Sequence, residues 1–126
     1  MKKIIFTDKA PAPIGPYSQA VLSGNTLYTS GQIALHPETG ELITSDIEAE
    51  TKQVMENMKA VLGAAGMGFE NVIKATIFIS NMDDFARINS VYSSYINEKT
   101  APARETVQVA RLPKNVNVEI SMIAVK

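Results

Sequence analysis

The chain has 126 residues, with 12 Lys and Arg against 13 Asp and Glu, a net charge of −1 and no cysteine. This length predicts a single domain over residues 1–126 that folds without a disulfide or a metal. The lack of cysteine excludes a thiolate nucleophile and cysteine-ligated zinc. The balanced charge argues against a nucleic-acid partner, and no apolar run approaches the ~18 residues of a membrane span. We therefore expect a cytoplasmic protein with neither nucleic acid nor membrane as its partner.

The first part of the chain predicts short strands separated by turns. A strand is expected over residues 4–7, followed by a stiff connector over residues 10–16 in which prolines exclude a helix. Residues 17–23 and 26–30 flank Gly24-Asn25, a pair that tolerates positive φ, and this pattern predicts a hairpin.

The middle of the chain predicts a helix, a central strand and a second helix. A capping box formed by Ser45 and Glu48 indicates that the first helix begins at Ser45, and Gly66 is expected to end it. The second helix is expected over about residues 83–97, with Asn81 as its cap. The strand is expected over residues 72–80, with Ile73, Ala75, Ile77 and Ile79 on one face and Val72, Lys74, Thr76, Phe78 and Ser80 on the other.

Two strands, over residues 105–112 and 116–125, are expected to close the chain as a hairpin around Pro113-Lys114-Asn115. The order of elements predicts an α+β sandwich, in which two amphipathic helices cover one face of a sheet of about six strands. No segment remains to cover the other face, whose mixed composition suits a subunit interface. We therefore expect an oligomer.

Polar residues interrupt the apolar patterns at informative positions. Asn89 lies inside the apolar stripe of the second helix, where a bond to neighbouring backbone would satisfy it. Arg104 can present its planar fork to a carboxylate, although a plain surface arginine also explains it. Glu119 falls on the polar face of its strand. In solvent it is an ordinary carboxylate, whereas under another subunit its pKa would rise, which suits a general base.

Other candidates are weaker. Ser30-Gly31 ends a strand where glycine would let a ligand approach the backbone, and a plain turn explains it equally well. Tyr17 follows Gly15-Pro16 and can be a core ring with its hydroxyl bonded. His36 is the only histidine, which excludes an imidazole metal cluster, and the HExxH, Walker A and GxGxxG motifs are absent.

The predicted closing hairpin bears on where Arg104 and Glu119 can act. If Leu112 pairs with Val116, Glu119 stands opposite Val109 and about 17 Å along the strand from Arg104. One small ligand cannot then touch both side chains of a single chain. This register predicts a composite site between two chains.

Motifs along the whole chain carry a family resemblance. The segments are Ile14-Gly15-Pro16-Tyr17-Ser18, Thr29-Ser30-Gly31-Gln32-Ile33, Asp84-Phe85 with Asn89-Ser90-Val91-Tyr92, Ala101-Pro102-Ala103-Arg104, Val107-Gln108-Val109-Ala110-Arg111-Leu112-Pro113, Val118-Glu119-Ile120 and Ile123-Ala124. Together they resemble the RidA family, also called YjgF or perchloric-acid-soluble proteins. The C-terminal block is the most specific.

The resemblance implies a homotrimer with a chorismate-mutase-like α+β fold and a ligand cleft at each subunit interface. It implies hydrolysis of reactive 2-enamine and 2-imine acids, such as 2-aminoacrylate and 2-iminobutanoate, to 2-oxo acids and ammonia, with no metal and no cofactor. Matched by position, Arg104 would grip the substrate carboxylate and Glu119 would activate water. The residues that would line the cleft are Tyr17, Ser30, Gly31 and Asn89.

Two departures from the family pattern and two rival functions remain. Thr106 stands where many members carry cysteine, which leaves a small polar group in the cleft, and Glu105 stands where a small uncharged residue is common. Glu105 should point away from Arg104, since neighbours in a strand face opposite sides.

One rival to the deaminase function is a trimeric module that binds or senses a small carboxylate without turnover. The other is an RNA-acting protein, against which the charge balance argues.

Overall fold

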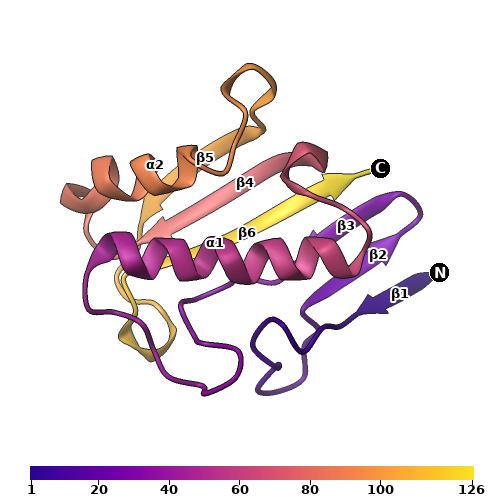
Figure 1. The fold of residues 1–126 in the computed structure, drawn as a ribbon, viewed down its shortest axis with the longest axis horizontal. Coiled ribbons are helices and arrows are strands. Elements are labelled where there is room, and N and C mark those ends of the chain that lie inside the picture. The colour runs from indigo at the N-terminus through magenta and orange to yellow at the C-terminus, as the bar shows by residue number, and fades with distance from the viewer.

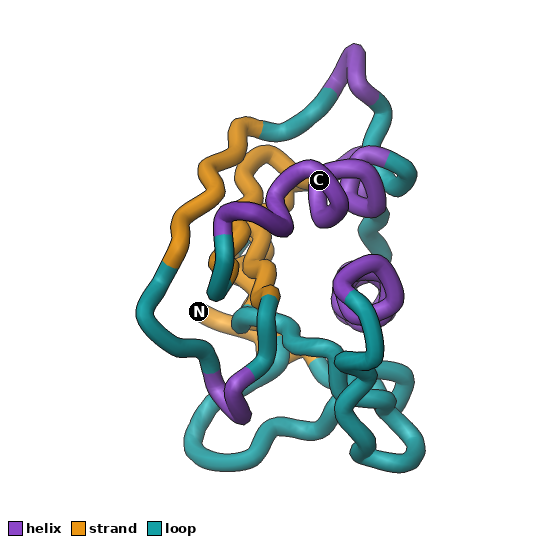
Figure 2. Tube along the Cα trace, turned by 90° about the vertical axis from the view of Figure 1, so that its left-hand side faces the viewer, coloured by secondary structure: helices purple, strands orange, loops and turns teal.

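The computed structural model describes the whole chain, Met1–Lys126. One six-stranded sheet has the order β1-β2-β3-β6-β4-β5, and two α-helices pack against it (Figure 1). The view along α1 shows both helices on the same side of the sheet, which confirms the predicted α+β fold (Figure 2). The strands are β1 (Lys2–Ile5), β2 (Ala20–Ser23), β3 (Thr26–Thr29), β4 (Val72–Ile79), β5 (Ala103–Gln108) and β6 (Val118–Val125), and the helices are α1 (Ile47–Ala64) and α2 (Phe85–Ser93).

Strand β6 lies between β3 and β4 and runs antiparallel to both. Its side chains alternate strictly between buried and half-exposed along its whole length. The buried set faces the helices, so Glu119 and Ser121 lie on the face of the sheet that no helix covers. The buried side chains of this strand are Val118, Ile120, Met122 and Ala124.

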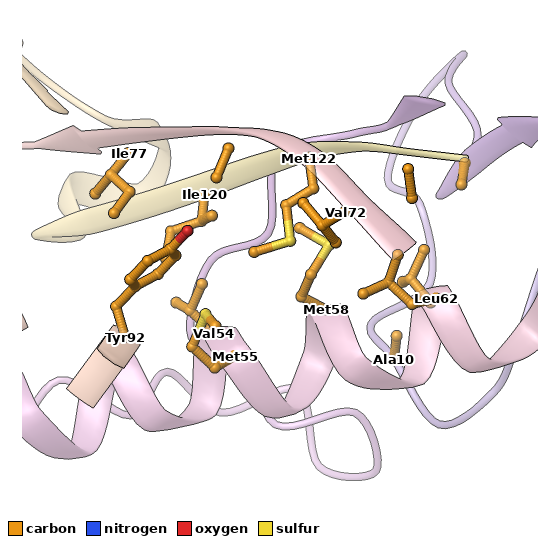
Figure 3. Close-up of a cluster of buried hydrophobic side chains, with 14 of the residues drawn as sticks. Ala10, Val54, Met55, Met58, Leu62, Val72, Ile77, Tyr92, Ile120 and Met122 are labelled. Carbon is orange, nitrogen blue, oxygen red and sulfur yellow. The ribbon is translucent and has the colours of Figure 1, made fainter. Parts of the chain in front are cut away.

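The core fills the space between α1 and the sheet (Figure 3). Apolar side chains of α1 recur at helical spacing and meet the buried face of β6, and the ring of Tyr92 from α2 closes one end. Each fully buried aliphatic side chain contributes about 1.5–3 kcal/mol relative to exposure. The residues of α1 in this contact are Val54, Met55, Met58 and Leu62. No helix combines the length and the apolarity needed to cross a bilayer.

The start of α1 is one residue later than the predicted capping box. Asp46 is the N-cap, and its side chain accepts a hydrogen bond from the Ala49 amide at 2.8 Å. Asp caps a helix as well as Ser does, and capping from Asp46 makes the buried Ile47 the first helical residue. The prediction that Ser45 begins the helix is therefore wrong by one position.

A β-bulge in β4 exchanges the predicted faces of two residues. The pairing with β6 shifts between Val72 and Lys74, so Val72 points into the core while Ile73 is 53% exposed on the opposite face. Beyond the bulge, Ala75, Ile77 and Ile79 are buried as predicted. Strict alternation had placed Val72 on the uncovered face, and this prediction is wrong because an extra residue resets the period.

The predicted closing hairpin does not form. Strand β5 pairs in parallel with β4 at the edge of the sheet, and α2 makes the crossover between them. The chain then passes β4 to reach β6 on its other side. Residues Pro113–Asn115 form a 3-10 turn within this longer connection, not a hairpin loop. The register that placed Glu119 opposite Val109 is therefore wrong.

The second helix is shorter than predicted. Asn81 accepts a hydrogen bond from the Asp83 amide at 2.9 Å and so caps a 3-10 turn, Met82–Asp84, that leads into α2. The helix ends at Ser93, and the next hydroxyl, that of Ser94, donates to the Val91 carbonyl at 2.6 Å. The aromatic and aliphatic residues that follow still pack on the core from outside the helix.

A buried carboxylate fastens the start of β6 to α1. Glu50 has no exposed surface, and its oxygens accept hydrogen bonds from the Asn117 amide at 2.7 Å, the Asn117 side chain at 2.8 Å and the Val118 amide at 3.3 Å. Asn117 also accepts a bond from the Ser80 hydroxyl at 3.2 Å. The entry of β6 is thus fixed two residues before Glu119.

We expect Glu50→Ala to lower the free energy of unfolding by about 3 kcal/mol, because unpaired buried donors cost ~1–3 kcal/mol each. Urea unfolding followed by circular dichroism measures this loss. The matched control is Glu48→Ala on the exposed side of α1, where Glu48 pairs with Arg87 at the surface. A Glu50→Ala loss no larger than that of Glu48→Ala would contradict the assignment.

Candidate active site

The predicted site residues fall into two groups on opposite faces of the sheet. Tyr17, Ser30, Gly31 and Glu119 line one groove on the uncovered side, which we call the Glu119 groove. The other residues line two adjoining depressions beside α2, which we call the Arg104 surface. Its predicted members are Asn89, Arg104 and Thr106.

The floor of the Glu119 groove is formed where the chain leaves β3. Thr29 turns its hydroxyl toward β6 and accepts a hydrogen bond from the Met122 amide at 2.9 Å. Gln32 then exchanges two backbone hydrogen bonds with Ile120, at 2.8 and 3.1 Å. The residues between these contacts bulge out of the ladder, and Gly31 is brought onto the face where Glu119 lies.

The Glu119 carboxylate lies directly on Gly31. A methyl group on Gly31 would be 2.5 Å from the Glu119 Oε2 and 2.8 Å from the carboxyl carbon. Contacts this short do not occur, so any larger residue at position 31 must displace the carboxylate. The backbone of Gly31 is therefore open to close approach, and the group that approaches it in this chain is the Glu119 side chain.

Glu119 is half-buried, and desolvation by this burial raises the pKa of its carboxyl above the usual value. No hydrogen-bond donor or cation within the chain pairs with its side chain. A carboxylate with a raised pKa and free oxygens is suited to accept a proton from water. The carboxylate of Glu119 is thus already partly desolvated in a single chain, without a second subunit covering it.

The walls of the Glu119 groove enclose about 530 Å³ and come from the N-terminal connector and the loop before β6. Tyr17 is 52% exposed, and its hydroxyl accepts a hydrogen bond from the Ile14 amide at 3.3 Å, so it is not a core ring. Gly15, with φ of +126°, makes the turn that presents it. The hydroxyl of Ser30 donates to the Ser18 carbonyl, which ties the bulge to the segment just before β2.

One buried amide holds the connector in place. The Gln19 side chain is 2% exposed, accepts a bond from the Thr7 amide at 2.8 Å, and donates to the carbonyls of Thr7 at 3.0 Å and Pro11 at 2.9 Å. Prolines cannot donate backbone hydrogen bonds, so this part of the chain depends on a side chain to fix it. Nothing in the strand pattern of the sequence marks Gln19, so this role was not predicted.

On the Arg104 surface, the guanidinium is held by side chains of α2. Its Nη1 donates to the Asn89 Oδ1 at 2.6 Å, and its Cζ lies 5.1 Å from the centre of the Tyr92 ring and 5.7 Å from that of Phe85. Asn89 therefore binds Arg104 and not the neighbouring backbone. Arg104 itself is exposed and has no carboxylate within ion-pair distance.

The residues that flank Arg104 along β5 have different surroundings. The Thr106 hydroxyl is buried and has no hydrogen-bond partner within the chain. Glu105 points to the opposite face and pairs with Lys74 at 3.1 Å. This confirms the expectation that Glu105 does not neutralise Arg104.

The two groups cannot meet within one chain. Glu119 stands beside Phe78 of β4, which stands beside Val107 of β5, three positions beyond Arg104. This places the two Cα atoms about 14 Å apart, given ~3.3 Å per residue and ~4.8 Å between strands. The side chains also point to opposite faces of the sheet. The separation of Arg104 and Glu119 thus comes from the strand order and the opposite faces, and not from the predicted hairpin register.

The residues that support the predicted ones were not predicted for that role. Phe85 and Tyr92 match the helical spacing of apolar residues in α2, and both also face Arg104. Glu50 carried a usable signal, since a charged residue three positions after Ile47 and four before Val54 lies within a buried stripe. No group of three or more His, Cys, Asp or Glu side chains is placed to hold a metal ion.

Comparisons with known proteins show the family of the chain. The model of the family described as endoribonuclease L-PSP matches residues 7–126. The 2-iminobutanoate/2-iminopropanoate deaminase of Escherichia coli K12 is 46% identical and aligns with 100% of this chain and 99% of its own. A RutC family protein of Pyrococcus horikoshii is 52% identical over 100% of this chain and 99% of its own.

Solved structures give the same result. The Escherichia coli TdcF protein with bound serine is 48% identical and superposes with a TM-score of 0.93 over 98% of each chain. A putative endoribonuclease of Thermotoga maritima is 53% identical and gives a TM-score of 0.97 over 100% of this chain and 98% of its own. The fold defines a protein of the YjgF type, with a chorismate-mutase-like sheet. The chain belongs to the RidA family, also named YjgF, L-PSP or RutC.

We expect Glu119→Gln to raise the free energy of unfolding at neutral pH. A folded-state pKa above the unfolded value means that the native protein binds the proton more tightly, so stability falls as pH rises through the interval between the two values. The amide has no charge to desolvate. The higher free energy of unfolding of Glu119→Gln should therefore appear above the pKa of Glu119 in the folded protein and vanish below its pKa in the unfolded chain. Unfolding curves of both proteins across this pH interval measure it, and a pH-independent difference would contradict the burial argument.

Proposed function

We propose that this protein hydrolyses reactive 2-imine and 2-enamine acids, such as 2-iminobutanoate and 2-aminoacrylate, to 2-oxo acids and ammonia in the cytoplasm. The observation that carries this proposal is the state of Arg104, which is held in place while its charge has no carboxylate partner. Such a guanidinium is suited to a substrate carboxylate. The Escherichia coli deaminase, 46% identical over this whole chain, supports the reaction class.

The chemistry needs only groups that the chain supplies. Arg104 binds the carboxylate and so fixes the neighbouring C=N carbon. Glu119 takes one proton from water, whose oxygen bonds to that carbon while the C=N π bond opens, and the proton passes to nitrogen to give a carbinolamine. The hydroxyl proton of the carbinolamine then moves through Glu119 to nitrogen, the C–N bond breaks as the C=O bond forms, and ammonia and the 2-oxo acid leave. A 2-enamine acid enters the same route after a proton has moved from its nitrogen to C3. Because imines already hydrolyse in water, orientation and a base are sufficient.

We further propose a homotrimer in which each site joins the Arg104 surface of one chain to the Glu119 groove of the next. The separation of Arg104 and Glu119 within one chain supports this. So do the exposed apolar side chains on the uncovered face of the sheet, which form a surface suited to association. They include Tyr28, Ile73 and Val107, which are 51%, 53% and 42% exposed. Thr106 would contribute its unpartnered hydroxyl to the same cleft.

Two other activities make different use of the site. A module that senses a small carboxylate needs Arg104 but not the base, and TdcF with bound serine shows that a relative holds an amino acid. An RNA-acting role, which the family description names, would need a basic track that a chain of net charge −1 does not provide. The raised pKa of Glu119 favours the deaminase.

We expect Arg104→Ala to lower kcat/KM for 2-iminobutanoate by about 10²-fold or more, because the carboxylate loses its bidentate partner. Arg104→Lys should be nearly as poor, since a point charge does not reproduce the fork.

Glu119→Gln should bind 2-oxobutanoate like the wild type while turnover falls by about 10²-fold. A coupled assay measures these rates, with a threonine dehydratase supplying the imine and the oxo acid detected directly. Unchanged turnover in Glu119→Gln, with intact binding, would leave the sensing module as the better function.

Subunit mixing tests the composite site. Arg104→Ala and Glu119→Gln proteins, each inactive alone, are unfolded, refolded together and assayed. Mixed trimers should recover activity, because some interfaces join an intact Arg104 to an intact Glu119. Refolding each variant alone is the control. No recovery in proven mixed trimers would place both residues in one chain's half of the site.

A further inference from the structure

The side chains that contact the Arg104 guanidinium are uncharged and come from one helix. Asn89 accepts a hydrogen bond from Nη1 at 2.6 Å, and the rings of Phe85 and Tyr92 lie within 6 Å of Cζ. Positions 85, 89 and 92 are four and three residues apart, so they share one face of α2. The guanidinium is thus supported by two aromatic rings and one amide.

The one arginine of α2 is in a contrasting environment. Arg87 donates to Glu48 at 2.7 Å and lies 3.9 Å from Asp84, so carboxylates compensate its charge. Arg104 has no such partner, although acidic residues are close. Glu98 lines the same depression without an ion pair to Arg104, and Glu105 points to the other face, where it pairs with Lys74.

We propose that Phe85, Asn89 and Tyr92 are positioning residues that fix the orientation of the Arg104 guanidinium and leave its charge free for a substrate carboxylate. This inference rests on the proposed function, since it assumes that Arg104 binds the carboxylate. An unsupported arginine would lose side-chain freedom when the ligand binds, and a supported one has already lost it. A carboxylate at position 89 would hold the fork equally well but would neutralise it.

The Tyr92 hydroxyl shows which part of that side chain acts. Tyr92 is 4% exposed, and its hydroxyl is buried without any hydrogen-bond partner. The face of the ring, which attracts a cation, is the part that meets Arg104. Removing the hydroxyl alone therefore leaves the support of the guanidinium intact, whereas removing the ring does not.

The test measures binding of 2-oxobutanoate by calorimetry, and KM and kcat for 2-iminobutanoate, on the intact assembled protein. Asn89→Asp keeps the shape and changes only the charge. It should weaken 2-oxobutanoate binding by tenfold or more, raise KM more than it lowers kcat, and leave the unfolding temperature unchanged or higher. Ser90→Asp is the matched control, because it adds the same charge on the next, exposed residue of α2. Equal effects of Asn89→Asp and Ser90→Asp would overturn the proposal.

The aromatic support is tested separately. Tyr92→Leu and Phe85→Leu should each raise KM severalfold, and Tyr92→Phe should restore most of the affinity that Tyr92→Leu loses. Tyr95→Leu removes a ring that packs on Phe69 and not on Arg104, and serves as the control for a lost aromatic ring. A loss of kcat without a change in KM, or a Tyr92→Phe protein as weak as Tyr92→Leu, would overturn the positioning role.

Arg104→Ala separates the two ways in which the argument can fail. If Arg104→Ala binds 2-oxobutanoate normally, the carboxylate is held elsewhere, and the proposed function fails together with this inference. If Arg104→Ala loses binding while the α2 variants keep it, the guanidinium needs no support and this inference alone fails. Loss of binding in Arg104→Ala, with graded losses in the α2 variants, supports both.

Discussion

The pairing of β6 between β3 and β4 is the constraint on which the sheet and the Glu119 groove depend. It gives the sheet its buried face, because alternate residues of β6 meet α1, and it leaves Glu119 on the opposite face. The same strand makes the bridge to Gln32 that brings Gly31 beneath the carboxylate. Because β6 runs antiparallel to both neighbours, β3 and β4 are parallel to each other, and α1 lies in the crossover that connects them. A buried carboxylate, Glu50, fixes the residue at which β6 begins.

The type and approximate position of most helices and strands could be predicted from the sequence. The order in which the strands pair in the sheet could not. Periodicity identified both helices and the central strands, because burial on one face imposes a period that is visible in the residues themselves. It could not place β5. A short segment between two apolar runs resembles a hairpin, whereas the pairing of β5 with β4 is set by the crossover through α2. The bulge at Val72 and Lys74 was missed for a related reason, since one extra residue leaves no local mark.

The polar residues of the candidate site could be proposed from the sequence. The residues that hold them in place could not. Arg104, Glu119 and Asn89 stand out because a polar residue in an apolar pattern needs a reason. Gln19 and the paired rings of Phe85 and Tyr92 match the apolar or strand patterns around them, so their second role becomes visible only in three dimensions. The family motifs include Phe85 and Tyr92 without indicating what each ring touches, and they do not include Gln19.

Placing the cation and the carboxylate on opposite faces prevents them from neutralising each other. An arginine in contact with Glu119 would lower the pKa of that carboxyl and would itself be unavailable to a ligand. In this chain burial raises the pKa of Glu119, and the charge of Arg104 has no acidic partner. The burial of the Glu119 carboxylate costs stability, as does the loop beside it, where Lys114 and Asn115 have φ of +54° and +59°. Under the proposed function, these costs are the physical requirement for a site that becomes complete only when a second chain and a substrate carboxylate bring the two groups together.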